Sequence, residues 1–219
     1  YTAKQVYNGL AGLLYIDDEN VDLPNDYAVN DFPLVLQDRT FVDGKIVYEE
    51  VANTMSTLGD TVMINGVVNP YLTAPREVVR LRVLNGSNSM QYDLKFDNDL
   101  PFQLIATDGG FVNKPETMQS LTLGAGERAE ILVDLSKVEG DSLTLWNNEM
   151  ELLPIRLSGE RKVVQYANSL NEIEITDELL NAEPSKVVTM EGMTKNFLLN
   201  GQTFDPERID FKQEQGVTE

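Results

Sequence analysis

Alternation of apolar and polar side chains with a period of two is the feature that most limits the fold of this chain. It runs through residues 79–83, 102–106 and 128–135, and Leu132 is the exception in the last of these. A period of two is typical of β-strands with one buried face. Short strands separated by Gly, Pro, Asn and Asp clusters are typical of antiparallel sandwiches or barrels. We therefore predict an all-β, antiparallel fold.

Composition excludes several kinds of chemistry. The chain has 219 residues, no Cys and no His, so it lacks the usual general base and the usual ligands of zinc, copper and non-haem iron. Its formal charge of −19 argues against nucleic acid or an anionic membrane surface as a partner. No apolar run approaches the ~18 residues of a membrane span. Carboxylates and hydroxyls are the groups that remain for catalysis.

An Asn-Gly motif occurs twice, in residues 63–66 (MING) and 197–201 (FLLNG), and a Pro follows each copy. The two Asn-Gly pairs are 135 positions apart, about the length of one domain. Between them, residues 161–185 are polar and acidic, which indicates an interdomain linker on a surface. A short helical turn is expected in this linker around residues 176–180.

The two ends of the sequence resemble parts of domains. Residues 5–18 (QVYNGLAGLLYIDD) read like the last, buried strand of a domain. After the first Asn-Gly motif the sequence continues into the strand pattern of residues 80–85, whereas the second motif is followed by no such strand before Glu219. We therefore expect the end of one domain, one whole domain and the start of a third.

Six motifs together resemble those of the multicopper oxidases, the laccase-like proteins built from three cupredoxin β-sandwiches, and the bacterial members most of all. They are GLAGLLYIDD (9–18), DFPLVLQDRTF (31–41), PYLTAPREVVRLRVLNGSN (70–88), IATDGGFV (105–112), LGAGERAEILVDL (123–135) and FLLNGQTFDPERIDF (197–211). Each motif is weak alone, but they cover most of the chain in the family's order.

This resemblance implies a cupredoxin-like antiparallel Greek-key β-sandwich with partial neighbouring domains. Residues 1–20 would be the C-terminal end of the first cupredoxin domain, and about 28–160 the whole second domain. Residues 161–185 would be the linker, and 186–219 the start of the third domain. A second polypeptide or a second copy of the chain would then complete the first and third domains.

The implied activity of the parent protein is one-electron oxidation of phenolic or metal-ion substrates coupled to reduction of O₂ to water. In the family the copper ligands lie in the first and third domains, so no catalytic, cofactor-binding or metal-binding residue is assigned to this chain, which alone would not be an enzyme. The alternative is a copper-free cupredoxin scaffold of the cell-division type. The exported members of the family suggest an extracytoplasmic parent, and the compartment stays open.

The sequences that flank this chain would distinguish the two alternatives. An oxidase should have a His-x-His pair just before Tyr1. Beyond Glu219 it should have a strand resembling VRLRVLN, then a His-x-x-His-x-His cluster, and later a His-Cys-His motif with an axial Met. A copper-free scaffold would keep the strands and replace these His residues.

Other candidate sites have plainer interpretations. Met190 and Met193 could bind copper, but without nearby His or Cys we interpret them as packing residues. Residues 97–99 begin like a calcium loop but lack its Asn/Asp-Gly, so we expect a hairpin tip. The acidic residues 17–19 and 49–50 could form glycosidase-type pairs, but solvated surface charge is the simpler interpretation.

Three arginines, Arg76, Arg80 and Arg82, form the main basic cluster. Alternation along a strand would place Arg80 and Arg82 on one face. There they could pair with acids across a domain interface, and we interpret them as members of surface ion pairs.

Overall fold

The structure, a computed structural model, describes residues 2–16, 21–48, 57–183, 186–192 and 197–212. These residues divide into two compact units, one within residues 1–172 and one within residues 173–219. Each unit is considered by itself.

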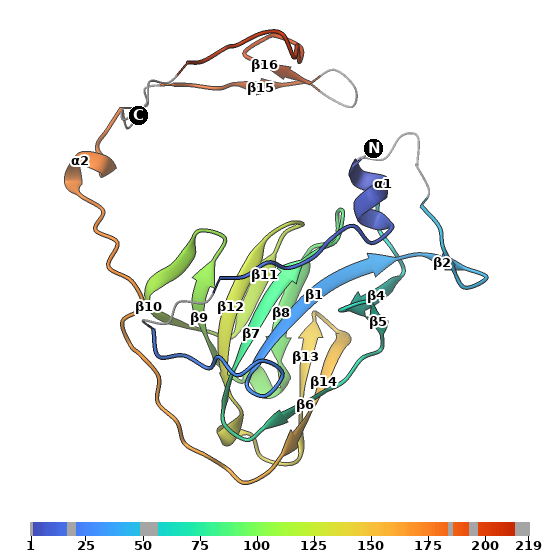
Figure 1. The fold of residues 1–219 in the computed structure, drawn as a ribbon, viewed down its shortest axis with the longest axis vertical. Helices are drawn as coiled ribbons and strands as arrows, with labels where there is room; N and C mark the ends of the chain where they lie inside the picture. The colour runs from blue at the N-terminus through green and yellow to red at the C-terminus, as the bar shows by residue number, and fades with distance from the viewer. Residues whose placement is uncertain (1, 17–20, 49–56, 184–185, 193–196, 213–219) are drawn as a thin grey trace. The chain divides into compact units, whose positions relative to one another are not determined.

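Short strands make up most of the first unit (Figure 1). Its elements are α1 (Thr2–Tyr7), β1 (Asp31–Arg39), β2 (Phe41–Val42), β3 (Lys45–Ile46), β4 (Thr61–Ile64), β5 (Val67–Val68), β6 (Leu72–Pro75), β7 (Val78–Asn85), β8 (Tyr92–Phe96), β9 (Phe102–Thr107), β10 (Gly110–Met118), β11 (Ser120–Leu123), β12 (Arg128–Asp134), β13 (Ser142–Asn147) and β14 (Met150–Ser158). Two 3₁₀ turns, Asp97–Asp99 and Leu135–Lys137, connect strands.

The described strands of this unit form two main sheets that pack as a sandwich. The large sheet has the order β10-β9-β12-β7-β1-β4-β5, and the small sheet has the order β11-β8-β13-β14-β6. Most neighbours are antiparallel, as predicted, but β1 pairs in parallel with β7, and β14 with β6. The parallel pairs arise because the chain crosses between the sheets before it returns.

The main core lies between the two sheets and follows the period-two pattern. Val79, Leu81 and Val83 of β7 are at most 1% exposed and pack with apolar residues of the small sheet. Phe96 of β8 and Phe102 of β9 meet edge to face, with ring centroids 5.7 Å apart. The alternation read from the sequence therefore marks the inner face of each sheet.

A second, smaller core lies on the outer face of the large sheet and explains why Leu132 broke the pattern. Leu132 packs there with Val78, Ile105 and the buried Leu170. Residues 163–170, in the first part of the predicted linker, lie along this face (Figure 1). Backbone bonds fix them: the Ala167 N–H donates to the Asp22 carbonyl and the Leu170 N–H to the Asn113 carbonyl. The large sheet is therefore covered on both faces here, so apolar residues can follow one another along β12 and Leu132 need not alternate with its neighbours.

The N-terminal residues differ from the sequence prediction. Residues 2–7 form α1, and the described residues 9–16 are extended without strand pairing, so the predicted buried strand is wrong here. Leu14 is 88% exposed. Helix α1 is fixed instead by Tyr7, which is buried and whose hydroxyl accepts a hydrogen bond from the Thr40 N–H at 2.7 Å. Residues 9–16 are apolar on both faces, so a buried strand there would need protein packed on both sides. No described residue covers the outer side.

The second unit is sparse. Helix α2 (Asp177–Leu180) confirms the predicted helical turn, and β15 (Met190–Glu191) pairs antiparallel with β16 (Leu198–Leu199). None of the described helices in either unit is long and apolar enough to span a membrane.

Candidate functional site

The arginines of β7 lie on the outer face of the large sheet, where β7 runs between β1 and β12. Arg82 donates to Asp31 of β1 from Nε at 2.9 Å and from Nη2 at 2.6 Å. Arg80 Nε donates to Glu130 of β12 at 2.7 Å, and Arg82 Nη1 lies 3.5 Å from the other Glu130 oxygen. The cross-strand register places Glu130 directly opposite Arg82. The four residues therefore form one ion-pair network.

The network is buried, which corrects the prediction of surface ion pairs. Arg80, Arg82 and Asp31 are each at most 3% exposed. The cover comes from other parts of the chain, because the Tyr15 ring stacks 4.2 Å from the Arg82 guanidinium and Phe111 lies 5.6 Å from that of Arg80. Sequence alternation correctly placed both arginines on one face of the strand. Nothing in the local sequence showed that Tyr15 packs over this face. Arg76, by contrast, pairs with the exposed Asp141.

A cavity of about 360 Å³ borders this network. Its lining includes residues 13–16, Arg80, Arg82, residues 106–111 and residues 128–130. The third arginine, Arg128, pairs with Asp108 at 2.7 Å, so each cation beside the cavity has a carboxylate partner. Because the charges balance, the cavity offers no excess charge to an anionic ligand. The arrangement serves instead to hold the extended residues 13–16 on the sheet.

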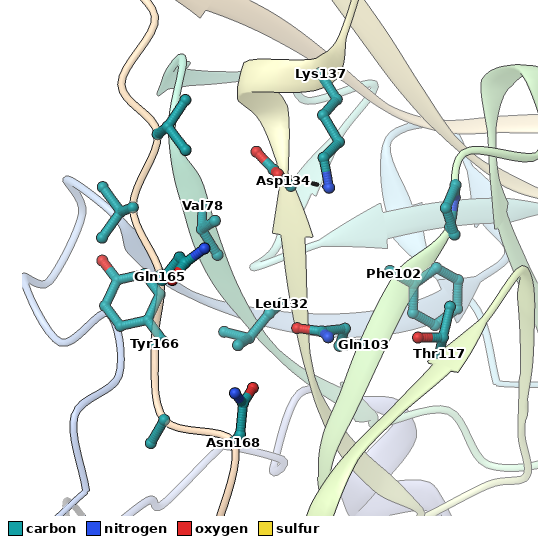
Figure 2. Close-up of a pocket in the computed structure, with 14 residues that line it drawn as sticks. Val78, Phe102, Gln103, Thr117, Leu132, Asp134, Lys137, Gln165, Tyr166 and Asn168 are labelled. Carbon is teal, nitrogen blue, oxygen red and sulfur yellow. Dashed lines mark ion pairs between the residues drawn. The ribbon is translucent and has the colours of Figure 1, made fainter.

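A second cavity, of about 480 Å³, lies between the large sheet and residues 163–168. Figure 2 shows Val78, Leu132 and Gln103 on the strands, beside Gln165 and Tyr166 of the segment that follows β14. Lys137 and Asp134 form an ion pair at 3.0 Å at one side of it. Burial raises the pKa of Tyr166, and the nearby Glu77 and Asp22 raise it further. The lining offers amides, one ion pair and a neutral phenol, and no activated nucleophile among these described residues.

The residues of this chain do not fit a copper site. A blue copper site needs two His and a Cys, and the chain has neither residue type. The described residues also contain no group of three Asp or Glu that could hold a metal ion. Met190 is 85% exposed, so its predicted packing role is wrong within the described residues, and Met193 lies outside them.

The structure also differs from the prediction at the acidic candidate sites. Residues 97–99 form a turn between β8 and β9, which belong to different sheets, so the predicted hairpin tip is wrong. Asp97 accepts hydrogen bonds from the Trp146 Nε1–H and the Thr144 N–H, and thus ties this turn to β13. Residues 17–19 and 49–50 lie outside the described residues.

A family model described as multicopper oxidase matches residues 30–151, more than half of the chain. The chain belongs to the multicopper oxidase family. It is 42% identical over 97% of its length to the multicopper oxidase mco of Staphylococcus haemolyticus, of which it covers 45%. It is 34% identical over its whole length to the cell division protein FtsP of Escherichia coli, of which it covers 50%. The chain thus spans about half the length of these curated relatives.

A solved structure supports the fold. The laccase of Pediococcus acidilactici matches 87% of this chain and 42% of its own with a TM-score of 0.75 at 33% identity. The cupredoxin-like β-sandwich inferred from the sequence is therefore confirmed, and so is the resemblance to the laccase-like oxidases.

Proposed function

We propose that this chain is the connecting part of a multicopper oxidase that couples one-electron oxidation of phenolic or metal-ion substrates to reduction of O₂ to water. Identity of 42% to a multicopper oxidase over almost the whole chain carries the proposal. The copper ions supply the electron transfer and the O₂ chemistry, and they are bound outside this chain, which has no His and no Cys.

The chain's own residues act as a rigid support. The buried pair of Arg82 with Asp31 fixes β7 against β1, and Tyr15 above Arg82 fixes residues 13–16 on the same face. Buried charges with full hydrogen bonding are costly to separate. Copper ligands carried by neighbouring domains would need a rigid support of this kind, because functional ligands must be held at constant geometry.

We also propose that further polypeptide completes the outer domains, either the remaining parts of the same protein or a second copy. The described apolar side chains of residues 10–16 and 187–211 support this. They include Leu10, Leu14, Ile16, Val187, Met190, Phe204 and Ile209, each more than 60% exposed. Exposed apolar surface on this scale is typical of an interaction surface.

A copper-free scaffold is the second candidate. It is favoured by the match to FtsP, which covers the whole chain at 34% identity. The higher identity to the multicopper oxidase, 42% against 34%, is the reason for proposing the copper-dependent function first.

Copper content and oxygen consumption test the proposal. The natural gene product that contains this sequence should bind copper stoichiometrically, absorb in the blue and consume O₂ with a phenolic or Cu⁺ substrate. The 219-residue chain alone should hold no stoichiometric copper after dialysis against excess Cu²⁺. A natural gene product with its strands intact but no bound copper would establish the scaffold alternative instead.

A further inference from the structure

Asn-Gly pairs can modify themselves in water, and this chain has four of them, at residues 8–9, 65–66, 85–86 and 200–201. The Gly nitrogen attacks the side-chain carbonyl carbon of the Asn, and because Gly has no Cβ, nothing hinders its approach. The reaction needs a Gly N–H that is free to lose its proton and an Asn side chain that is free to turn toward it. The hydrogen bonds of each pair therefore decide whether it reacts.

Two of the four pairs have a Gly N–H that is already bonded. The Gly9 N–H donates to the Val6 carbonyl at 3.0 Å, and the Gly86 N–H donates to the Leu36 carbonyl at 2.8 Å. Asn85 is also buried, and its Nδ2 donates to two backbone carbonyls. A bonded amide loses its proton only after that bond opens, so the reaction is slow at both pairs.

The other two pairs occupy equivalent two-residue turns. The φ angles are 52° and 78° in the turn at residues 65–66, and 51° and 72° in the turn at residues 200–201. Hairpin turns with positive φ at both central residues favour Asn-Gly. No described residue accepts a hydrogen bond from the N–H of Gly66 or Gly201. The Asn side chains must therefore make the difference between these two turns.

Both Asn side chains are bonded to the opposite strand, but Asn65 is held more firmly. Asn65 Oδ1 accepts from the Val35 N–H at 2.8 Å, and Asn200 Oδ1 accepts from the Thr189 N–H at 2.7 Å. Asn65 Nδ2 also donates to the Pro33 carbonyl at 2.9 Å. No described residue accepts from Nδ2 of Asn200. Both oxygen and nitrogen of the amide are thus fixed at Asn65, and only the oxygen at Asn200.

The strands beside the turns add to this difference. Leu36 of β1 lies opposite Ile64 of β4. Met190 of β15 lies opposite Leu199 of β16 and is therefore the counterpart of Leu36. Ile64 is 3% exposed, whereas its counterpart Leu199 is 52% exposed. Opening the first turn disturbs a packed strand, but a two-stranded hairpin such as the second is marginal in water and opens readily.

We propose that Asn200 is a site of spontaneous deamidation, and that Asn65, in the equivalent turn, is protected from the same reaction. The Gly201 nitrogen forms a bond to Cγ of Asn200 as the Cγ–Nδ2 bond breaks, and the amide leaves as ammonia with the proton of the Gly201 N–H. Water then opens the resulting imide ring. Cleavage of the new N–Cγ bond gives Asp, and cleavage between that nitrogen and the main-chain carbonyl carbon gives isoaspartate. The net reaction consumes water and releases ammonia, without oxidation or reduction.

The products change the second hairpin. Isoaspartate carries the main chain through Cβ and Cγ, which lengthens the turn by one carbon, so the turn no longer fits a two-residue hairpin. Either product also adds a negative charge to residues 173–219, which contain ten Asp or Glu and four Lys or Arg. We therefore expect β15 and β16 to separate after the reaction, while the sandwich stays folded.

Peptide mapping by mass spectrometry tests the proposal on the 219-residue chain, incubated in warm, mildly alkaline buffer. The mass increase from replacement of NH₂ by OH should appear at residue 200 at least about tenfold faster than at residue 65, because the extra hydrogen bond and the packed strand oppose opening there. A higher rate at Asn65 than at Asn200, equal rates, or no mass increase at residue 200 would overturn the proposal.

The same chain unfolded in guanidinium chloride is the control for local sequence. All four pairs are Asn-Gly, so they should react at similar rates once the fold is lost. A preference for residue 200 that persists in the unfolded chain would assign it to local sequence and overturn the structural explanation.

Two substitutions provide a matched pair. Gly201→Asn adds a Cβ that hinders the attack, at a position with open space around it, and Asn tolerates the positive φ. This variant should slow the mass increase at residue 200. Gly66→Asn makes the same change in the first turn and should leave the rate at residue 200 unchanged. An undiminished rate at residue 200 in Gly201→Asn would contradict attack by the Gly201 nitrogen.

The modified chain carries an added negative charge and can be separated by ion exchange. Its Thr189 amide should exchange with deuterium faster than in the unmodified chain, since the bond to Asn200 is lost. Unchanged protection at Thr189 would contradict the predicted opening of the hairpin. The inference does not rest on the proposed function, and none of its readouts involves copper or oxidase activity, so the two can fail independently.

Discussion

The two Asn-Gly hairpins have the same local structure and very different surroundings. Asn65 and Asn200 have φ angles of 52° and 51°, and their side chains accept equivalent backbone hydrogen bonds. Yet Ile64 beside the first turn is 3% exposed, and Leu199 beside the second is 52% exposed. Local sequence is enough to form the turn, because Asn and Gly tolerate the positive φ that it requires. Burial depends on strands that are distant in sequence.

The comparison predicts that stability resides in the first unit. A two-stranded hairpin is marginal in water, whereas a sandwich of many strands is stable by itself. The single Trp, Trp146, lies on β13 of the sandwich, so its fluorescence reports unfolding of that unit. Equivalent substitutions in the two units should therefore have unequal effects on this signal.

The largest difference is expected for ion pairs. Arg82→Ala leaves Asp31 buried without its main partner, and should lower the free energy of unfolding by about 3–5 kcal/mol. Arg208→Ala removes an exposed pair with Asp210 and should leave the free energy of unfolding nearly unchanged, because solvent screens exposed pairs. Urea titration followed by Trp146 fluorescence measures both. The double variant Arg82→Met, Asp31→Leu should recover most of the loss, and failure to recover would contradict the role assigned to the buried charge.

Apolar truncation should follow the same order. Leu36→Ala opens a cavity in the main core and should destabilise the sandwich by about 2–5 kcal/mol. The equivalent Met190→Ala removes an exposed side chain and should change the free energy of unfolding by at most about 0.5 kcal/mol. Thermal unfolding of both variants tests the difference. Similar losses in the two would show that β15 is buried in the protein.

Ionisation of tyrosine at alkaline pH should act on the first unit alone, since residues 173–219 contain no Tyr. Burial raises the pKa of Tyr92 to about 12, and nearby Asp38 adds to this while the Ser87 hydrogen bond opposes it. The neutral phenol is therefore favoured more strongly in the folded protein than in the unfolded chain, where the pKa of Tyr92 is 10.0. The resulting stabilisation, about 3 kcal/mol, is complete below pH 10 and is lost as the pH rises toward 12.

The variant Tyr92→Phe isolates this effect. Its free energy of unfolding, measured in urea between pH 9 and 12, should fall less steeply than that of the parent chain. Parallel curves for the two proteins would exclude Tyr92 as the source of the pH dependence.

The smallest difference is expected at the turns themselves. Asn65→Ala loses the bonds to Val35 and Pro33 and places Ala at positive φ, which should cost about 1–3 kcal/mol in the sandwich. Asn200→Ala should leave global unfolding unchanged and accelerate amide exchange at Thr189. A global loss from Asn200→Ala would mean that the two units unfold together.

Several features of the fold were predictable because local pattern determines them. The alternation in β7 and β12 marked their inner faces, and the Asn-Gly motifs marked both turns. The arginine alternation correctly placed Arg80 and Arg82 on one face. The candidate site was less predictable, since the carboxylate partners of these arginines lie about fifty residues away in sequence, and Tyr15, which covers Arg82, lies near the N-terminus.

The sequence by itself determined the all-β class, the two related hairpins, and the lack of the His and Cys that a blue copper site needs, since residue types and spacing are sufficient for these. The tertiary structure decided which charges are buried, that α1 replaces part of an expected strand, and that Leu132 faces a second core. Such outcomes depend on contacts between distant segments. A side chain becomes buried only when another part of the chain excludes water from it, and no local pattern records which part that is.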